Sequence, residues 1–140
     1  MTNPERADSG TPFPNLPGAS RLAAELPPVY GKEATVVLSG KAATERALKD
    51  RAADFDVLHC AVHGVFDAAA PLHSHLRLAP SDGDDGLLEA REIMNLRINA
   101  SLAVLAACET GRGGEDAGEG VIGMSWAFFL AGCPAVMATQ

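Results

Sequence analysis

The chain has 140 residues, which is the length of a single domain. Hydrophobic residues make up 47% and charged residues 21%, so the composition is that of a globular protein and not of a disordered one. The net charge of −7 would repel a phosphate backbone, so nucleic-acid binding has little electrostatic support.

Several features favour a protein of the cytoplasm. The longest apolar run, residues 121–138, is interrupted by glycine and proline and is not expected to span a membrane. Residues 1–10 lack the pattern of a secretory signal. The three cysteines are an odd number and do not suggest a disulfide framework, which indicates a reducing compartment. Three lysines against eight arginines, with abundant alanine and glycine, favour a bacterial source.

Residues 1–31 are predicted to form an irregular, Pro-rich segment, because they hold six of the nine prolines. A helix is expected there only around residues 19–26. From residue 32 onward, short strands and helices alternate. The expected strands cover 35–38, 55–62, 101–107 and 135–139, and the expected helices cover 42–53, 90–96 and 121–131.

Three further elements complete the prediction. Residues 76–88 are expected to form a β-hairpin with an Asp-Gly turn. A Gly-rich loop is expected over 111–120. The helix over 121–131 is apolar on all sides and is therefore expected to be buried.

The alternation of strands and helices predicts an α/β fold with a mostly parallel sheet. The strands at 55–62 and 101–107 are apolar on both faces, as expected where helices cover both sides of a sheet. The chain stops directly after the strand at 135–139, which indicates a domain that is incomplete at its C-terminus.

Two polar residues follow the two apolar strands. His63 comes after the strand at 55–62 and precedes Gly64, and Cys108 comes after the strand at 101–107. Ligands of open α/β sheets bind outside the carboxyl ends of the strands. Neighbouring strands lie about 5 Å apart, so an imidazole there can reach a thiol and favour the thiolate. The backbone N–H groups of Gly64 and Cys108 are candidate donors to an oxyanion.

Residues 58–64 (Leu-His-Cys-Ala-Val-His-Gly) and 105–111 (Leu-Ala-Ala-Cys-Glu-Thr-Gly) resemble the two signature segments of the CHAT domain family. Members of this family are caspase-like cysteine peptidase domains, often found beside tetratricopeptide repeats. The resemblance covers roughly residues 17–140. It also includes, in the family's order, Ala43-Thr44 at a helix start, the strand-turn at 76–88, the helix start at 90–93, Gly118-Glu119-Gly120 and the apolar segment 127–132.

The resemblance implies a caspase-like three-layer sandwich with a β-hairpin insertion, formed by residues 32–140 after the segment 1–31. It implies a cysteine endopeptidase in which His63 and Cys108 are the catalytic dyad and a thioester is the intermediate, with no metal and no organic cofactor. Its substrate would be a protein or peptide, and a tetratricopeptide-repeat or sensor protein would be its partner. The alternative is a non-catalytic or latent protein-interaction module, or a fragment of a larger repeat-containing regulatory protein. Family members continue past residues 135–139 with strands and loops that this chain lacks.

Several residues keep two interpretations. Asp67 either orients the imidazole or lies on a loop surface, and Glu109 either contributes to a specificity pocket or caps the next turn. Cys60 and Cys133 lie within apolar runs and are expected in the core.

Three sequence patterns match metal-binding or dinucleotide-binding motifs in spacing alone. His59 and His63 have the spacing of a helical zinc pair, but on a strand they would lie about 13 Å apart. His73 and His75 could hold a metal weakly, although a solvated loop is the simpler interpretation. The glycine pattern over 118–123 matches a dinucleotide fingerprint but is far from its strand and is flanked by acids, so a loop covering Cys108 explains it better.

Overall fold

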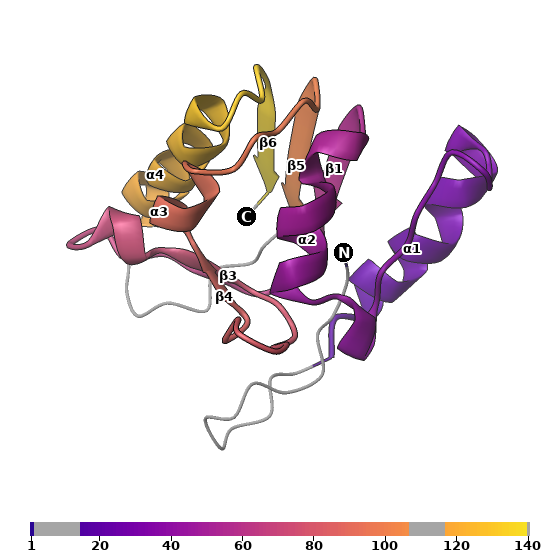
Figure 1. Ribbon diagram of the computed structural model, residues 1–140, viewed down its shortest axis with the longest axis horizontal. Helices are drawn as coiled ribbons and strands as arrows, with labels where there is room; N and C mark the ends of the chain where they lie inside the picture. The colour runs from indigo at the N-terminus through magenta and orange to yellow at the C-terminus, as the bar shows by residue number, and fades with distance from the viewer. Residues whose placement is uncertain (2–14, 107–116, 140) are drawn as a thin grey trace.

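The computed structural model describes residue 1, residues 15–106 and residues 117–139 (Figure 1). Helices and strands alternate along most of this chain, as the sequence predicts for an α/β protein. In chain order they are α1 (Pro17–Tyr30), α2 (Glu45–Arg51), β1 (Val57–Cys60), β2 (Gly64–Val65), β3 (His75–Arg77), β4 (Leu87–Glu89), α3 (Ala90–Ile93), β5 (Leu102–Ala106), α4 (Ala117–Leu130) and β6 (Val136–Thr139).

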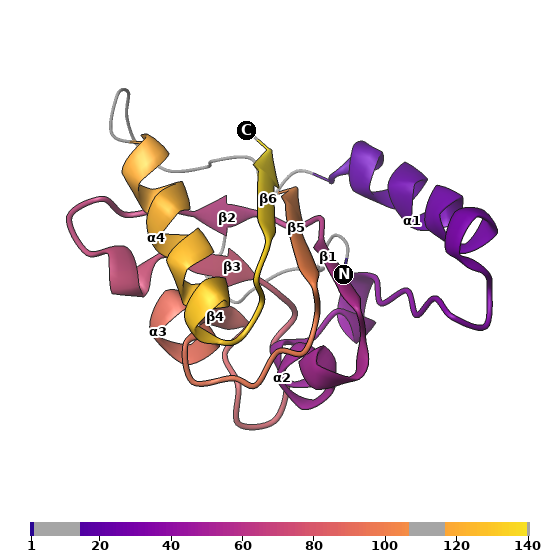
Figure 2. The same ribbon diagram turned by 90° about the horizontal axis from the view of Figure 1, so that it is seen from above.

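The predicted parallel sheet is confirmed. Its strand order is β1-β5-β6, and both neighbouring pairs are parallel. The strands of the predicted hairpin, β3 and β4, are also confirmed, but they belong to a second, antiparallel sheet with the order β2-β3-β4. Figure 2 shows the two sheets lying next to each other, with β2 continuing from the end of β1. The fold is therefore α/β with one parallel and one antiparallel sheet.

One face of the parallel sheet forms the core. Cys60 and Leu105 are register partners on this face, and both are buried. They belong to one apolar cluster with Phe128 of α4 and Ile93 of α3. Helix α4 contacts β6 of the parallel sheet. It also contacts α3, the helix that directly follows β4 of the antiparallel sheet, so α4 bridges the two parts of the fold (Figure 2).

Local signals explain where the helices begin and end. The hydroxyl of Thr44 accepts a hydrogen bond from Ala47 N (3.1 Å) and caps the start of α2. Gly132, with a φ of 110°, allows the left-handed turn that ends α4, and Cys133 N donates to Phe128 O (3.0 Å).

A charge cluster built around the buried Glu45 links α2 to the hairpin and to α3. The ammonium of Lys49 lies 2.8 Å from Asp84 and 2.9 Å from Glu92, and it also pairs with the buried carboxylate of Glu45. Glu45 in turn accepts a hydrogen bond from Gly86 N (2.8 Å). Burial alone would lower the pKa of Lys49, but the hydrogen bonds to the three carboxylates outweigh it and raise that pKa.

The N-terminal part differs from the prediction in two places. Helix α1 runs over Pro17–Tyr30, longer than the expected 19–26, and includes Pro27 and Pro28. It continues past the prolines because Gly31 N donates to Pro27 O (2.9 Å) and closes the last turn. The predicted strand over 35–38 does not form, and Val36 and Val37 remain exposed by 44% and 41%. The division of the chain at residue 31 stays a prediction.

Helix α4 also differs from the prediction. It begins at Ala117, inside the expected loop, and only one of its sides is buried. Met124, Ala127 and Phe128 face the core. The apolar residues of the opposite side remain exposed, namely Ile122, Trp126, Phe129 and Leu130. Uniform hydrophobicity therefore did not mean uniform burial. Among the described residues, no helix is both long enough and apolar enough to cross a membrane.

Candidate active site

His63 lies where the chain leaves the parallel sheet and enters the antiparallel one. It follows β1 by three residues and directly precedes Gly64, the first residue of β2. The residue is buried, with 3% of its surface exposed. Its carbonyl accepts a hydrogen bond from Arg77 N of β3 (2.8 Å), so its backbone is held by the second sheet as well as by β1.

The register of the parallel sheet determines which segments leave it side by side. Cys60 of β1 pairs with Leu105 of β5 in the last pair of this ladder. The carboxyl ends of both strands therefore meet at one edge of the sheet, where His63 is found. Cys108 and Glu109, which follow β5, lie outside the described residues.

The register of β2 and β3 determines where the main-chain N–H of Gly64 points. It pairs with Leu76 of β3, and the ladder bond beside this pair joins Arg77 N to His63 O. Gly64 and Leu76 are thus a non-hydrogen-bonded pair, in which the N–H groups point away from the partner strand. The N–H of Gly64 is therefore directed to the side of β2 opposite β3.

Asp67 has a local structural role. Its carboxylate accepts hydrogen bonds from Ala69 N (2.9 Å) and Ala70 N (3.0 Å). The main-chain N–H of Asp67 donates to the hydroxyl of Ser74 (2.9 Å). Ser74 is fully buried. These contacts favour the loop interpretation of Asp67, because they shape the turn that follows β2.

A contact that the sequence did not reveal fixes the segment after His63. Gly120 of α4 lies against Phe66, and a Cβ at Gly120 would come within 2.5 Å of the Cβ of Phe66. Gly123, one turn later, lies against Pro71 in the same way, at 3.2 Å. The glycine pattern thus belongs to a helix that packs closely on the loop after His63. A prediction of this contact would have required knowing that α4 begins before Gly120.

The histidines considered for metal binding have other surroundings. His59 Nε2 is buried, and burial, followed by the nearby N-terminal ammonium, lowers the pKa of His59. His73 Nδ1 lies 3.0 Å from a carboxylate oxygen of Glu89, whereas His75 Nδ1 lies 2.9 Å from the carbonyl of His73. The parts of the chain that the structure describes contain no group of three or more His, Cys, Asp or Glu residues that could hold a metal ion.

The two described cysteines lie in the core. Cys60 is buried, and burial raises the pKa of its thiol. Cys133 is fully buried, and its thiol donates to Ala135 O (3.2 Å). A thiol in such surroundings is inert, so neither residue competes with Cys108 as a candidate nucleophile.

The fold and the site together define an α/β protein that holds a buried histidine and an adjacent glycine at the carboxyl edge of a parallel sheet. The sequence model of the CHAT domain matches residues 1–140, and the chain belongs to this caspase-like family. Searches of the curated proteins and of the solved structures found no significant match.

Proposed function

We propose that the chain is a cysteine endopeptidase domain with a caspase-like sandwich fold, in which His63 and Cys108 form the catalytic dyad. The observation that carries the proposal is the pairing of Cys60 with Leu105. His63 and Cys108 each follow one of these partners by three residues. Membership of the CHAT family and the burial of His63 support the same assignment.

In the proposed mechanism, the thiolate of Cys108 attacks the carbonyl carbon of a peptide bond. The bond between sulfur and carbon forms as His63 donates a proton to the leaving amine, which gives a thioester and a free amino terminus. Water, deprotonated by His63, then attacks the thioester, and the acid product leaves as the thiol is restored. The N–H groups of Gly64 and Cys108 stabilise the oxyanion in both steps.

The proposed substrate is a protein or peptide, and no metal or organic cofactor takes part in these steps. Glu109, directly after the nucleophile, is proposed to contribute to the pocket that selects the substrate. The contacts of Asp67 support a positioning role, in which it shapes the loop after Gly64.

A second candidate function is a non-catalytic interaction module for a tetratricopeptide-repeat or sensor protein. It is favoured by the exposed apolar side of α4, where Trp126 is 59% exposed and Leu130 is 61% exposed. Apolar side chains gathered on one exposed surface are typical of an interaction site.

The test is cleavage of a peptide library derived from a bacterial proteome, read by mass spectrometry. The parent chain is compared with Cys108→Ala, with His63→Ala and with the surface control Lys41→Ala. Cleavage by the parent and the control, with a loss of about a thousandfold or more in both site variants, is the expected result. Equal cleavage by Cys108→Ala would contradict the dyad. A folded parent that cleaves nothing would favour the interaction module.

A further inference from the structure

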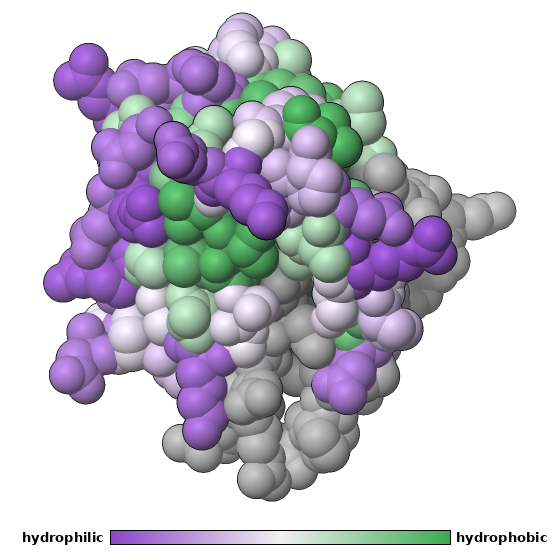
Figure 3. Space-filling model, turned by 90° about the vertical axis from the view of Figure 1, so that its right-hand side faces the viewer, coloured by the Kyte–Doolittle hydropathy of each residue, from purple (hydrophilic) through white to green (hydrophobic). Residues whose placement is uncertain are grey.

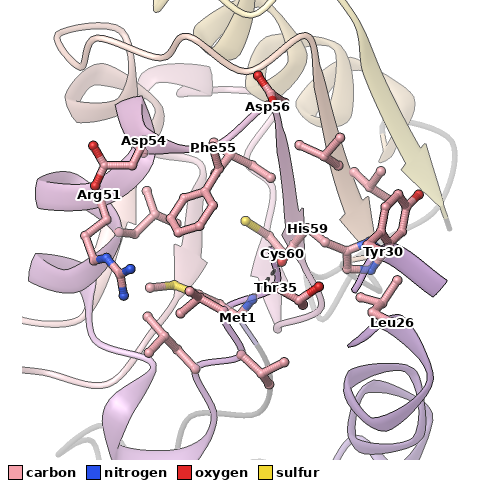
Figure 4. Close-up of a pocket in the computed structure, with 18 of the residues that line it drawn as sticks. Met1, Leu26, Tyr30, Thr35, Arg51, Asp54, Phe55, Asp56, His59 and Cys60 are labelled. Carbon is pink, nitrogen blue, oxygen red and sulfur yellow. Dashed lines mark hydrogen bonds between the residues drawn. The ribbon is translucent and has the colours of Figure 1, made fainter. Parts of the chain in front are cut away.

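A groove of about 550 Å³ runs along the outer edge of β1, between α1 and α2 (Figure 4). On one side, α1 contributes Leu22 and Leu26, both half-buried. On the other side, α2 contributes Leu48. Figure 3 shows that hydrophobic surface gathers on the side of the molecule where α1 lies, framed by hydrophilic residues. The walls of the groove are therefore apolar on both sides of the strand edge.

The floor of the groove carries main-chain hydrogen-bonding groups. Ser101 N donates to Asp56 O (2.8 Å), so alternate residues of β1 direct their main-chain groups toward β5. The residues between them, Val57 and His59, direct theirs to the opposite side. Because β1 is an edge strand of its sheet, the carbonyl of Val57 and the amide of His59 point out of the sheet into the groove.

This edge already accepts main chain in parallel register. The N-terminal ammonium of Met1 donates to His59 O (2.7 Å), and Ala61 N donates to Met1 O (2.8 Å). This is the bonding pattern of a parallel pair between Met1 and Cys60. The adjacent pairing position, through Val57 O and His59 N, lies along the groove.

Charge determines which chain suits the groove. Its acidic lining residues are Glu33, Asp54 and Asp56. The basic groups of the lining are the guanidinium of Arg51, which lies over the ring of Phe55, and the ammonium of Met1, which is bonded to His59 O. In Figure 4, Asp56 marks one end of the groove, before β1, and Met1 lies toward the other. A second copy of this chain, with a net charge of −7, is a poor match for such a rim.

We propose that the groove binds an extended segment of a partner protein, which adds to β1 as a parallel strand. Apolar walls on both sides require apolar or β-branched residues beside β1. About three consecutive ones fit, because Met1 already pairs with Cys60, the last of the four residues of β1. Since the segment runs parallel to β1, its basic residues precede this apolar stretch and lie beside Asp54 and Asp56. Main-chain pairing with β1 supplies affinity, as in other strand additions, and the acidic end supplies direction. The proposal does not depend on peptidase activity.

The probe is the synthetic peptide Arg-Lys-Val-Thr-Ile-Val-Thr-amide with a fluorophore attached to its amino terminus, and its binding to the full chain is followed by fluorescence anisotropy. Binding is expected to weaken at least about tenfold in Leu26→Asp, which places a charge on the groove wall. The matched control is Val29→Asp on the same helix, where the side chain is 76% exposed. The control should bind like the parent. A peptide with prolines at its third and fifth positions should not bind, because it lacks the pairing N–H groups.

Hydrogen exchange of the His59 amide provides the second readout. Its exchange is expected to be fast in the free chain and at least about tenfold slower with the peptide bound. The proposal is overturned if the peptide does not bind at about 1 mM, or if Leu26→Asp and Val29→Asp weaken binding equally. It is also overturned if the His59 amide is protected without peptide. Protection that is independent of protein concentration would assign the groove to the chain's own residues 35–38, and concentration-dependent protection would assign it to a second copy.

Discussion

Cys60 of β1 lies beside Leu105 of β5 in the parallel sheet, and this pairing aligns the two signature segments. His63 lies three residues beyond Cys60, and Cys108 lies three residues beyond Leu105. Adjacent strands are separated by about 5 Å, so the two segments leave the sheet as neighbours at the same edge. The proposed catalytic dyad depends on this pairing of two core residues.

The contact between Gly120 and Phe66 predicts that Gly120→Ala destabilises the protein. The added Cβ would lie 2.5 Å from the Cβ of Phe66, so the loop after His63 or helix α4 must shift. The expected loss is about 1–3 kcal/mol in the free energy of unfolding, measured by urea denaturation. Gly18→Ala, in α1, has no atom within 4 Å of its new Cβ and should be neutral or slightly stabilising. Equal effects of the two substitutions would contradict close packing at Gly120.

The charge cluster around Lys49 predicts a large effect of Lys49→Met. The change leaves the buried carboxylate of Glu45 without its ammonium partner and removes the link to Asp84. The expected loss is about 2–4 kcal/mol in the free energy of unfolding, measured by urea denaturation at pH 7. Lys41→Met, at an exposed position, serves as the control and should change stability little. A loss below about 0.5 kcal/mol in Lys49→Met would show that the cluster does not stabilise the fold.

Acid should destabilise the protein through two carboxyl groups. The hydrogen bond from Lys49 lowers the pKa of Asp84, and the hydrogen bond with His73, followed by that from Arg91, lowers the pKa of Glu89. A depressed carboxyl pKa contributes stability above the ordinary value of about 4, and this stability is lost as the pH falls through the folded-state pKa. The urea midpoint is therefore expected to decrease below about pH 4. A midpoint that rises on acidification from pH 5 to pH 3 would contradict these shifts.

The one-sided burial of α4 predicts opposite results for two neighbouring aromatic positions. Phe128 is fully buried, so Phe128→Ala should cost about 3–5 kcal/mol. Trp126 is 59% exposed and contacts Phe129 edge to face at 5.8 Å, so Trp126→Ala should cost no more than about 1 kcal/mol. Thermal and urea unfolding of the two variants would measure both losses. Similar losses would mean that the helix is buried on all sides.

Much of the fold could be predicted from local patterns. Apolar runs predict the two strands that carry the signature segments, and turn residues predict the hairpin strands. The left-handed φ that only glycine adopts easily predicts the helix end at Gly132. The structure contains all of these features. The segment 35–38 has the composition of a strand, but it pairs with no strand of the described part of the chain, and composition alone cannot reveal whether a partner strand exists.

The candidate site was predictable only in part. The position of His63 at a strand end follows from the sequence pattern, and its burial agrees with it. The sequence alone leaves the role of Asp67 open, because a carboxylate close to a histidine in sequence can either bond to the imidazole or bond to the loop backbone. In the structure the Asp67 carboxylate bonds to the backbone N–H groups of Ala69 and Ala70. The packing of Gly120 on Phe66 joins residues far apart in the chain and depends on where α4 begins, which no local signal marked.

The most direct test of the central claim is the alkylation rate of each cysteine, measured by mass spectrometry from pH 5 to pH 9 in the parent and in His63→Ala. Cys60 and Cys133 are buried and serve as internal probes of folding. The account predicts that Cys108 alone reacts quickly, keeps this reactivity below pH 7, and loses it in His63→Ala. A Cys108 that reacts like an ordinary thiol in both proteins, while Cys60 and Cys133 stay protected, would contradict the proposed dyad.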